Sequence, residues 1–531
     1  MAKVLFINPM VREEDVPRHV PYGMALLASI ADQRGHKVMI YDANAWRAGD
    51  LVLQEAIEAD EWDVIATGGI TTAYGSIKHI VKSARTHSPK SLIVAGGGFL
   101  TSMPRDIMKF LPEVDVGVVG EAFETFPAIL ENADKGDRDF TGIKGVIYRD
   151  QTGKGRLTPE RPLIQDLDTL PYPAWELFPL DIYFKNSSLL VSEEGMQSQR
   201  RLDINASYGC SLICRFCFHL GISGDMEYVE NSEGETDVAF TWKRNIRWHS
   251  PEYIVNLAKY AHQRFGVDFL AFLDENMMTM NAYTRWKWIP EICDRWIDGG
   301  LQPQCVRDGV EHNPETCKGV HWSGTSHATL YNQDVLHQMR RAGCSHLVYG
   351  LESFSERVLK NLGKGTTPQN NINAIRDTLA AGIRPIPNQI VGFPDDFFDS
   401  IRDSVNAWKK MGIVVFPFFA TPYPGSEWFY RYRSRILEQY DGDMESYLLD
   451  LGDATKITAV ISENFNAVEL LGLRELMVKG DLKRINEYEK VWRGFNGEPK
   501  IPDFIEEAKT GGRDYVKNLA MNLVPAASSG E

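Results

Sequence analysis

Three of the chain's seven cysteines stand close together, as Cys210, Cys214 and Cys217 in the stretch YGCSLICRFCFHLG. Thiolates are soft ligands that suit zinc and iron–sulfur clusters, and the C-x3-C-x2-C spacing lets one short loop supply all three to one metal centre. A structural zinc site needs four ligands, and His219 is the candidate fourth. A [4Fe–4S] cluster held by three thiolates instead leaves one iron open to a chelating substrate. Three unrelated thiols are the remaining alternative.

Polar residues follow three apolar stretches farther along the chain. Asp274 and Glu275 come after DFLAFL, Glu352 and Ser353 end HLVYGLES, and Gly392 follows IPNQIV. Side chains at the carboxyl ends of parallel strands face the mouth of a barrel, where ligands bind. Each has a plainer interpretation too. Asp274 and Glu275 can form salt bridges, Glu352 and Ser353 can be solvated strand ends, and Gly392 can be a simple strand exit.

Residues 201–435 alternate apolar strands with amphipathic helices. The predicted strands are 201–210, 268–277, 346–353, 386–394 and 414–425. The predicted helices are 251–266, 333–344, 370–382 and 397–412. This alternation predicts a partial or full β/α barrel. The acidic stretch 228–240 and the irregular stretch 302–326 interrupt it; each is either a solvated surface loop or a segment over the barrel mouth.

Residues 1–140 show the same alternation, with α/β character throughout. The predicted strands are 3–9, 37–43, 63–69, 91–98 and 114–121, and helices are expected at 23–35, 75–87 and 104–110. Uninterrupted apolar strands predict a parallel, doubly wound Rossmann-like sheet. No G-x-G-x-x-G follows the first strand, so a dinucleotide is disfavoured, while a nucleotide, a flavin or cobalamin fits. A connector with a hairpin at 145–158 is expected over 141–200, and a helical region over 436–531.

Composition narrows the class of protein. The chain has 531 residues and a net charge of −15, which argues against a broad nucleic-acid-binding surface. The chain contains no run of 18 apolar residues, so no membrane span is expected. The N-terminal MAKVLFINPM lacks the features of a signal peptide. Seven cysteines are a poor disulfide framework, so a reducing, cytoplasmic location is expected.

The cysteine loop, with Phe216 before its third cysteine, resembles that of the radical S-adenosylmethionine (SAM) superfamily. Four further segments look like landmarks of the branch with N-terminal cobalamin domains: LDEN (273–276), MRRAGCSHLVYGLESFSERVLKNLGKGTT (339–367), IVGFPDD (390–396) and TPYPGS (421–426). The resemblance implies a [4Fe–4S] cluster on the three cysteines, whose open iron chelates SAM. It also implies cleavage of SAM to methionine and a 5′-deoxyadenosyl radical.

The same resemblance suggests roles for the strand-end residues. Asp274 and Glu275 would lie near the SAM amino group. Glu352 and Ser353 would contact its ribose or amino acid part, and Gly392 would let the backbone approach the adenine.

The first domain resembles a cobalamin-binding domain in PYGMALLASIADQRGHKVMIYDAN (21–44) and GGITTAYGS (68–76). The D-x-H-x-x-G motif that would supply a histidine to cobalt is absent, so the lower cobalt face is expected to meet water, nothing, or a residue of the 70–74 loop. The candidate cobalamin contacts are Asn8, Pro9, Thr71, Thr72, Tyr74, Gly96, Gly97, Gly98, Gly120 and Glu121. Core packing remains an alternative for Tyr74, and turn formation for the three consecutive glycines.

Together the two modules imply a class B radical SAM methyltransferase of secondary metabolism. It would move a methyl group from SAM, through methylcobalamin, to an unactivated carbon or a phosphinate phosphorus of a small molecule. An external electron donor of the flavodoxin or ferredoxin type is expected, and no nucleic-acid or membrane partner. A non-methylating oxidation, cyclisation or rearrangement, and a non-catalytic cobalamin or redox sensor, are the alternatives.

The phosphinothricin P-methyltransferases are the group suggested by the opening NPMVREEDVPRHVPYG and the chain length. A phosphinate would need cationic partners. The candidate cations are Arg12, Arg18, Arg244, Arg247 and Arg307. The remaining cysteines show no second cluster spacing. Cys344, before a predicted strand, is expected to be a buried packing residue, whereas Cys305 and Cys317, in the irregular stretch, are candidates for a function of their own.

Overall fold

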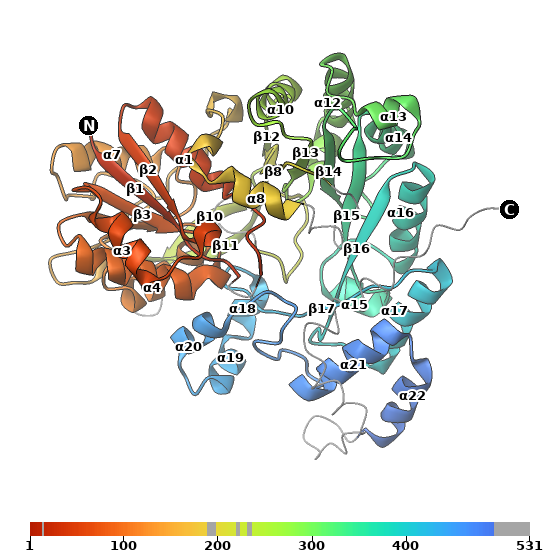
Figure 1. Ribbon diagram of the computed structural model, residues 1–531. Helices are drawn as coiled ribbons and strands as arrows, with labels where there is room; N and C mark the ends of the chain where they lie inside the picture. The colour runs from red at the N-terminus through yellow and green to blue at the C-terminus, as the bar shows by residue number, and fades with distance from the viewer. Residues whose placement is uncertain (13–14, 188–197, 219–223, 231–235, 493–531) are drawn as a thin grey trace.

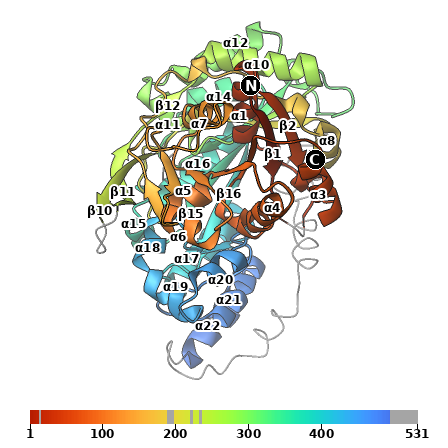
Figure 2. The ribbon, with the colours of Figure 1, turned by 90° about the vertical axis from the view of Figure 1, so that its left-hand side faces the viewer.

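The computed structural model describes residues 1–12, 15–187, 198–218, 224–230 and 236–492, with two α/β units and a helical C-terminal region (Figure 1). The first unit is red and orange, the second green to teal, and the C-terminal helices are blue. Figure 2 views the molecule with the first sheet in front of the second. Among the described residues, no helix is both long enough and apolar enough to span a membrane.

The first sheet has the strand order β2-β1-β3-β4-β5-β6-β7. Its strands are β1 (Lys3–Asn8), β2 (Lys37–Asp42), β3 (Val64–Gly68), β4 (Leu92–Gly96), β5 (Val116–Val118), β6 (Val146–Arg149) and β7 (Gly155–Leu157). The pairings from β2 through β5 are parallel, which confirms the predicted doubly wound sheet. The predicted hairpin forms β6 and β7, which extend this sheet through antiparallel pairings.

Short helices connect these strands and cover the sheet. They are α1 (Tyr22–Gln33), α2 (Ala43–Trp46), α3 (Asp50–Glu58), the 3-10 turn η1 (Thr71–Ala73), α4 (Tyr74–His87), α5 (Gly98–Ser102), α6 (Pro104–Phe110) and α7 (Thr125–Asp134). Helix α4 shows why they form: Ile77, Ile80, Val81 and Ala84 recur at helical spacing and are all buried. The connector follows with η2 (Leu167–Thr169), η3 (Trp175–Leu177) and α8 (Leu180–Ser187).

The second sheet has the order β17-β16-β15-β14-β13-β8, and every pairing in it is parallel. Its strands are β8 (Arg201–Ile204), β13 (Phe269–Phe272), β14 (His321–Ser326), β15 (Cys344–Glu352), β16 (Arg384–Val391) and β17 (Phe418–Phe419). Because β17 and β8 lie at opposite edges of the sheet, the barrel is partial. Both short strands β9 (Ser207–Tyr208) and β12 (Arg247–Trp248) pair with each other beside it.

The barrel helices are α10 (Pro251–Phe265), α11 (Met277–Tyr283), α12 (Trp288–Asp298), α13 (Gln304–Asp308), α14 (Gln333–Arg341), α15 (Glu356–Asn361), α16 (Pro368–Ala380) and α17 (Phe398–Met411). Their ends follow local sequence rules. In α10 the Ser250 side chain caps the N-terminus, Pro251 takes the first position, and Gly266 ends the helix in the left-handed conformation.

Three predictions about this region were wrong. The irregular stretch 302–326 contains α13 and the central strand β14, whose sequence HWSGTS is too polar and small to announce a buried strand. Residues 228–230 and 236–240 of the acidic stretch lie in the antiparallel strands β10 (Gly224–Glu230) and β11 (Thr236–Arg244) rather than in loops. The strand expected over 414–425 is only two residues long, and Pro417 directly before it lacks the N–H that would extend the pairing in that direction.

The described part of the C-terminal region, up to residue 492, is helical, as predicted. Its helices are α18 (Glu427–Arg431), α19 (Arg433–Gln439), α20 (Met444–Asp450), α21 (Ala467–Lys479) and α22 (Leu482–Val491). Figure 1 shows the first three below the first sheet and the last two below α17. Helix α20 packs against α4, and α22 packs against α17, so this region braces both sheets.

Candidate functional site

The cysteine loop begins directly after β9, at the carboxyl end of β8. Cys210 and Cys214 are buried and Cys217 is partly buried. Burial raises the pKa of the Cys214 thiol to about 11, and it raises the pKa of Cys217 well above the ordinary value, with further increases from the neighbouring thiols. The three thiols are therefore close enough to raise one another's pKa. A set of three soft donors gathered in one buried loop fits the cluster that the spacing predicts.

Backbone contacts hold this loop against the barrel. The Arg215 N–H donates to the Leu362 carbonyl at 3.1 Å, and the Arg215 carbonyl accepts from the Trp428 N–H at 3.2 Å. The Phe216 ring packs beside Trp428, with 5.7 Å between ring centroids. Phe216, the aromatic residue before the third cysteine, is therefore a packing residue that fixes the loop.

The acidic pair after β13 positions the beginning of the cysteine loop. Asp274 is buried and accepts hydrogen bonds from the Ala206 N–H at 3.1 Å and from the Ser207 hydroxyl. Burial raises the pKa of Asp274 to about 7. Glu275 is exposed and accepts from the Gly209 N–H at 3.0 Å. Both carboxylates thus bind the segment that leads to Cys210.

Gly209 is required at that point by its backbone. Its φ is +101°, and a Cβ there would lie 2.3 Å from the Asn245 carbonyl oxygen. A side chain would therefore displace the first cysteine of the loop.

A buried ion pair lies next to the cysteines. Lys364 Nζ is 3.0 Å from Glu352 Oε1, and both side chains are less than a tenth exposed. Burial alone would lower the pKa of Lys364, but the Glu352 carboxylate and the thiols of the loop raise it. The ammonium group in turn lowers the pKa of Cys214. Glu352 has a φ of +63°, a strained conformation for a residue with a side chain.

Three residues that sequence reasoning missed bring unpaired polar atoms to the same end of the barrel. Asn276, Ser326 and Gln389 are buried, and their side-chain polar atoms have no hydrogen-bond partner among the described residues. They follow β13, end β14 and lie near the end of β16. Buried polar groups are nearly always paired, so this set fits a polar ligand such as SAM. Asn276 is the last residue of LDEN (273–276), and its place in that segment was the signal for it.

Two other predicted SAM contacts have partners within the protein. The Gly392 N–H donates to Asp396 Oδ2 at 2.9 Å. The Ser353 hydroxyl accepts from the Ser355 N–H at 3.1 Å. Their roles toward SAM remain predictions.

The glycines of the first sheet pack against each other. A Cβ on Gly68 would lie 2.0 Å from the Gly96 carbonyl oxygen, and one on Gly97 would lie 2.6 Å from that of Gly69. The loops after β3 and β4 therefore meet backbone to backbone at the carboxyl edge. Ile70, in the loop after β3, has 56% of its surface exposed. An exposed apolar side chain beside a glycine-rich edge fits a flat apolar group such as a corrin ring.

Several predicted cobalamin contacts are engaged inside the protein. Asn8 donates from its amide to Asp42 Oδ1 at 2.7 Å, and the Tyr74 ring is buried with its hydroxyl donating to Glu445 Oε1 at 2.6 Å. The Gly120 N–H donates to the Thr101 hydroxyl at 3.0 Å. Tyr74 is therefore packed in the core, which is the alternative interpretation of this residue. Pro9 adjoins Gly69, Thr71 is buried, and Thr72 is partly exposed.

Glu121 and Arg247, which were assigned to different ligands, pair with each other. Arg247 Nη1 lies 2.9 Å from Glu121 Oε1, and both side chains are buried. Arg307 lies on α13 and pairs with Asp308, at the opposite end of the barrel from the cysteines. His219, the alternative fourth ligand, lies outside the described residues.

The cysteine loop touches the first domain through Phe218. A Cβ on Gly98, at the start of α5, would lie 3.2 Å from the Phe218 ring, and one on Gly425 would lie 2.3 Å from it. The residue after the third cysteine therefore packs between the glycine-rich edge of the first sheet and the segment after β17. The two predicted cofactor sites are neighbours.

Comparisons with known proteins agree with this arrangement. A model of the B12 binding domain matches residues 11–130, and a model of the radical SAM superfamily matches residues 204–407. In solved structures, the chain resembles OxsB, a cobalamin-dependent S-adenosylmethionine radical enzyme with aqua-cobalamin and S-adenosylmethionine bound. The TM-score is 0.60 at 16% identity, over 95% of this chain and 63% of OxsB, so the likeness concerns the fold and leaves part of OxsB unmatched.

Three curated relatives span most of the chain. An uncharacterized methyltransferase, PH0819, of Pyrococcus horikoshii is 28% identical over 82% of this chain and 84% of the relative. Cytidylyl-2-hydroxyethylphosphonate methyltransferase of Streptomyces wedmorensis is 22% identical over 80% of each chain. Anaerobic magnesium-protoporphyrin IX monomethyl ester cyclase of Synechocystis is 24% identical over 77% of this chain and 72% of the relative. The chain therefore carries a radical SAM domain and, before it in the sequence, a B12-binding domain.

Proposed function

We propose that the protein is a cobalamin-dependent radical SAM methyltransferase that acts on an unactivated carbon or a phosphinate phosphorus of a small molecule. The observation that carries this proposal is the contact of Phe218, next to Cys217, with Gly98 at the edge of the B12-binding domain. A substrate held between the two edges would face both cofactors at once. The methyltransferase names of two relatives support this reaction type.

When bound, the cluster with SAM supplies the 5′-deoxyadenosyl radical, and cobalamin carries the methyl group. The chain's residues bind and orient these groups. Cys210, Cys214 and Cys217 hold the cluster, while Asp274 and Glu275 fix the start of their loop. The Lys364 ammonium compensates negative charge on the thiolates.

For SAM, we assign hydrogen bonding to the unpaired polar atoms of Asn276, Ser326 and Gln389. Two exposed apolar side chains, Ile213 in the cysteine loop and Leu273 at the end of β13, offer surface that SAM or substrate would cover and keep from water.

For cobalamin, the glycine-rich edge allows a flat macrocycle to approach the backbone. Ile70, Thr71 and Thr72 are the residues proposed to face the macrocycle, since the Tyr74 hydroxyl already donates a hydrogen bond to Glu445. An external electron donor of the flavodoxin or ferredoxin type would reduce the cluster.

A phosphorus-containing substrate draws support from the relative that acts on a cytidylyl phosphonate. Arg244 has a buried Nε without a hydrogen-bond partner among the residues that the structure describes. Arg18 is already paired with Asp15 at 2.8 Å, and the exposed Arg12 lies 3.5 Å from Asp453. Arg244 is therefore the preferred cation for a phosphinate.

One observation favours a second function. The relatives include an anaerobic magnesium-protoporphyrin IX monomethyl ester cyclase, which aligns with 77% of this chain. A non-methylating cyclisation or oxidation is the second candidate.

The test is a product assay on anaerobically reconstituted, reduced protein supplied with cobalamin and SAM. The proposal predicts both S-adenosylhomocysteine, from use of SAM as methyl donor, and 5′-deoxyadenosine, from radical cleavage. Cys214→Ala should abolish 5′-deoxyadenosine by removing a cluster ligand, whereas Cys293→Ala, a buried cysteine in the core, should retain it.

The outcomes separate the candidates. Deoxyadenosine without S-adenosylhomocysteine would support the non-methylating reaction and contradict methyl transfer. Neither product under reducing conditions would contradict both and favour a sensor.

A further inference from the structure

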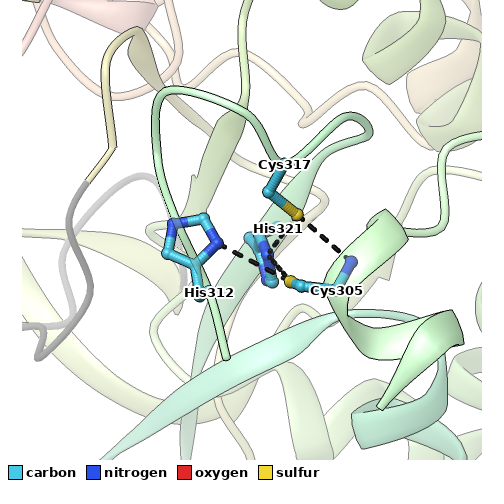
Figure 3. Close-up of side chains that lie close together, drawn as sticks. All are labelled: Cys305, His312, Cys317 and His321. Atoms are coloured by element: carbon cyan, nitrogen blue, oxygen red, sulfur yellow. Dashed lines mark hydrogen bonds between the residues drawn. The ribbon is translucent and has the colours of Figure 1, made fainter. Parts of the chain in front are cut away.

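Four metal-binding side chains meet at the other end of the barrel from the cysteine loop. They are Cys305 on α13, His312 and Cys317 in the connection that follows, and His321 at the start of β14. One sulfur or nitrogen atom from each lies within 4.8 Å of the corresponding atom of every other. Figure 3 shows the four side chains converging on one point from separate segments.

The distances between these atoms match the edges of a tetrahedron around one ion. Zinc lies about 2.3 Å from a thiolate and about 2.0–2.1 Å from an imidazole, which places sulfur and nitrogen ligands about 3.6 Å apart. Cys305 Sγ is 3.3 Å from His321 Nε2 and 3.6 Å from His312 Nδ1. Cys317 Sγ is 4.0 Å from His321 Nε2. The chain thus has the ligand spacing of a single bound ion.

The surroundings orient the ligands. His321 Nδ1 is 3.2 Å from the Gly343 carbonyl oxygen, which fixes the ring so that Nε2 turns toward the sulfurs. The Cys305 N–H points at Cys317 Sγ at 3.3 Å, as a backbone donor to a thiolate does. Cys305 and His321 are only 5% and 4% exposed, so two of the four ligands are already withdrawn from water.

We propose that Cys305, His312, Cys317 and His321 bind one zinc ion as a structural site. Two thiolates and two imidazoles fill all four tetrahedral positions and leave none for a substrate or a water. A Rieske-type [2Fe–2S] cluster uses the same donor types, but it places the cysteines on one iron and the histidines on the other. The direct proximity of Cys305 Sγ to both histidine nitrogens favours a single ion instead.

The place of the site explains what the ion would do. His321 is the first residue of β14 and Ser326 the last, so about 17 Å of strand separates the proposed zinc from the end that faces the cysteine loop. Strand β14 pairs with β13 and β15 in the middle of the sheet. The ion would fasten the long, sparsely structured connection between α12 and β14 to that central strand.

The decisive measurement is zinc and iron content by mass spectrometry of the full-length, anaerobically purified protein. We expect about one zinc ion per chain, besides the iron of the cluster. Cys317→Ser and His312→Gln should each lower the zinc content at least about tenfold without changing the iron content. Cys293→Ser, in a buried cysteine outside the site, is the matched control and should keep its zinc.

A second measurement does not depend on the variants folding. Wild-type protein exchanged with cobalt(II) should show the intense visible absorption of a tetrahedral thiolate site, and added Zn²⁺ should abolish it. Wild-type protein that holds less than about a tenth of an equivalent of zinc after incubation with Zn²⁺ would overturn the proposal. So would zinc that both ligand variants retain, or a Cys305–Cys317 disulfide in the reduced preparation.

Discussion

At the scale of single residues, Lys364 has a role beside the cysteines that its position in the sequence did not predict. It is buried, pairs with Glu352 and lowers the pKa of Cys214. The three cysteines could be predicted because their spacing is itself the signal. Lys364 and Gln389 could not be predicted, since each joins the site only through the folding of a different strand or loop, whereas Asn276 was signalled by its place in LDEN.

Lys364→Met should destabilise the protein by about 3–5 kcal/mol, because it leaves the Glu352 carboxylate buried without its cation. It should also reduce iron incorporation, since the Lys364 ammonium lowers the pKa of Cys214. The free energy of unfolding from urea denaturation and the iron content would measure the two effects.

Lys360→Met is the matched control, because Lys360 is exposed on the neighbouring helix α15, and it should change stability by less than about 0.5 kcal/mol. The double variant Glu352→Gln/Lys364→Met should be less destabilised than Lys364→Met alone. Equal stability of the two Lys variants would argue against a buried ion pair.

At the scale of elements, the turn between β16 and α17 is held by one carboxylate. Asp396 Oδ2 accepts from the Gly392 and Phe393 N–H groups, and Oδ1 accepts from the Ser400 hydroxyl at 2.7 Å. Burial raises the pKa of Asp396 to about 7 from the ordinary 3.8. The glycine predicted to approach adenine thus also serves a structural turn.

Asp396 should make stability fall as the pH rises from about 4 to about 7. Within this window the folded carboxyl keeps a proton that the unfolded chain releases, so its contribution is complete below pH 4 and lost above the folded pKa. Relative to Asp396→Asn, which cannot ionise, the wild type should lose on the order of 2–4 kcal/mol.

The measurement is the free energy of unfolding of both proteins between pH 4 and pH 8. The difference between the two curves isolates Asp396 from all other titrating groups. Parallel curves would contradict a raised pKa at this position.

Most elements could be predicted from periodicity, and the exceptions have physical causes. The parallel strands of the first sheet are continuous apolar runs, such as KVLFIN in β1, which are buried almost throughout. Strand β14 reads HWSGTS; it ends at Ser326, one of the residues proposed to bind SAM, and begins at the four-residue Cys/His cluster. Because few of its positions are apolar, a pattern based on hydrophobicity did not predict this strand.

At the scale of the molecule, the two domains are joined by buried polar contacts. Arg247 and Glu121 are 126 positions apart in sequence, and the Arg247 guanidinium also donates to the Ile164 carbonyl at 2.6 Å. The composition and element pattern could predict two α/β units, but not which charged residues would meet between them. The tertiary structure alone pairs a residue of one predicted site with a residue of another.

Arg247→Met should lower the free energy of unfolding by about 3–5 kcal/mol, because Glu121 would remain buried without its partner. Arg264→Met is the control, since Arg264 is 53% exposed in its pair with Glu176, and it should cost no more than about 1 kcal/mol. Urea denaturation would give both values. A loss as small for Arg247→Met as for Arg264→Met would show that the pair does not hold the domains together.

The packing of Phe218 between Gly98 and Gly425 has a consequence for protein engineering. The three positions lie in different parts of the chain, yet a Cβ at either glycine would meet the same aromatic ring. A chimaera that joins this B12-binding domain to another barrel must therefore exchange all three positions as one set. Domain shuffling at the connector alone would bring mismatched surfaces together beside the third cysteine.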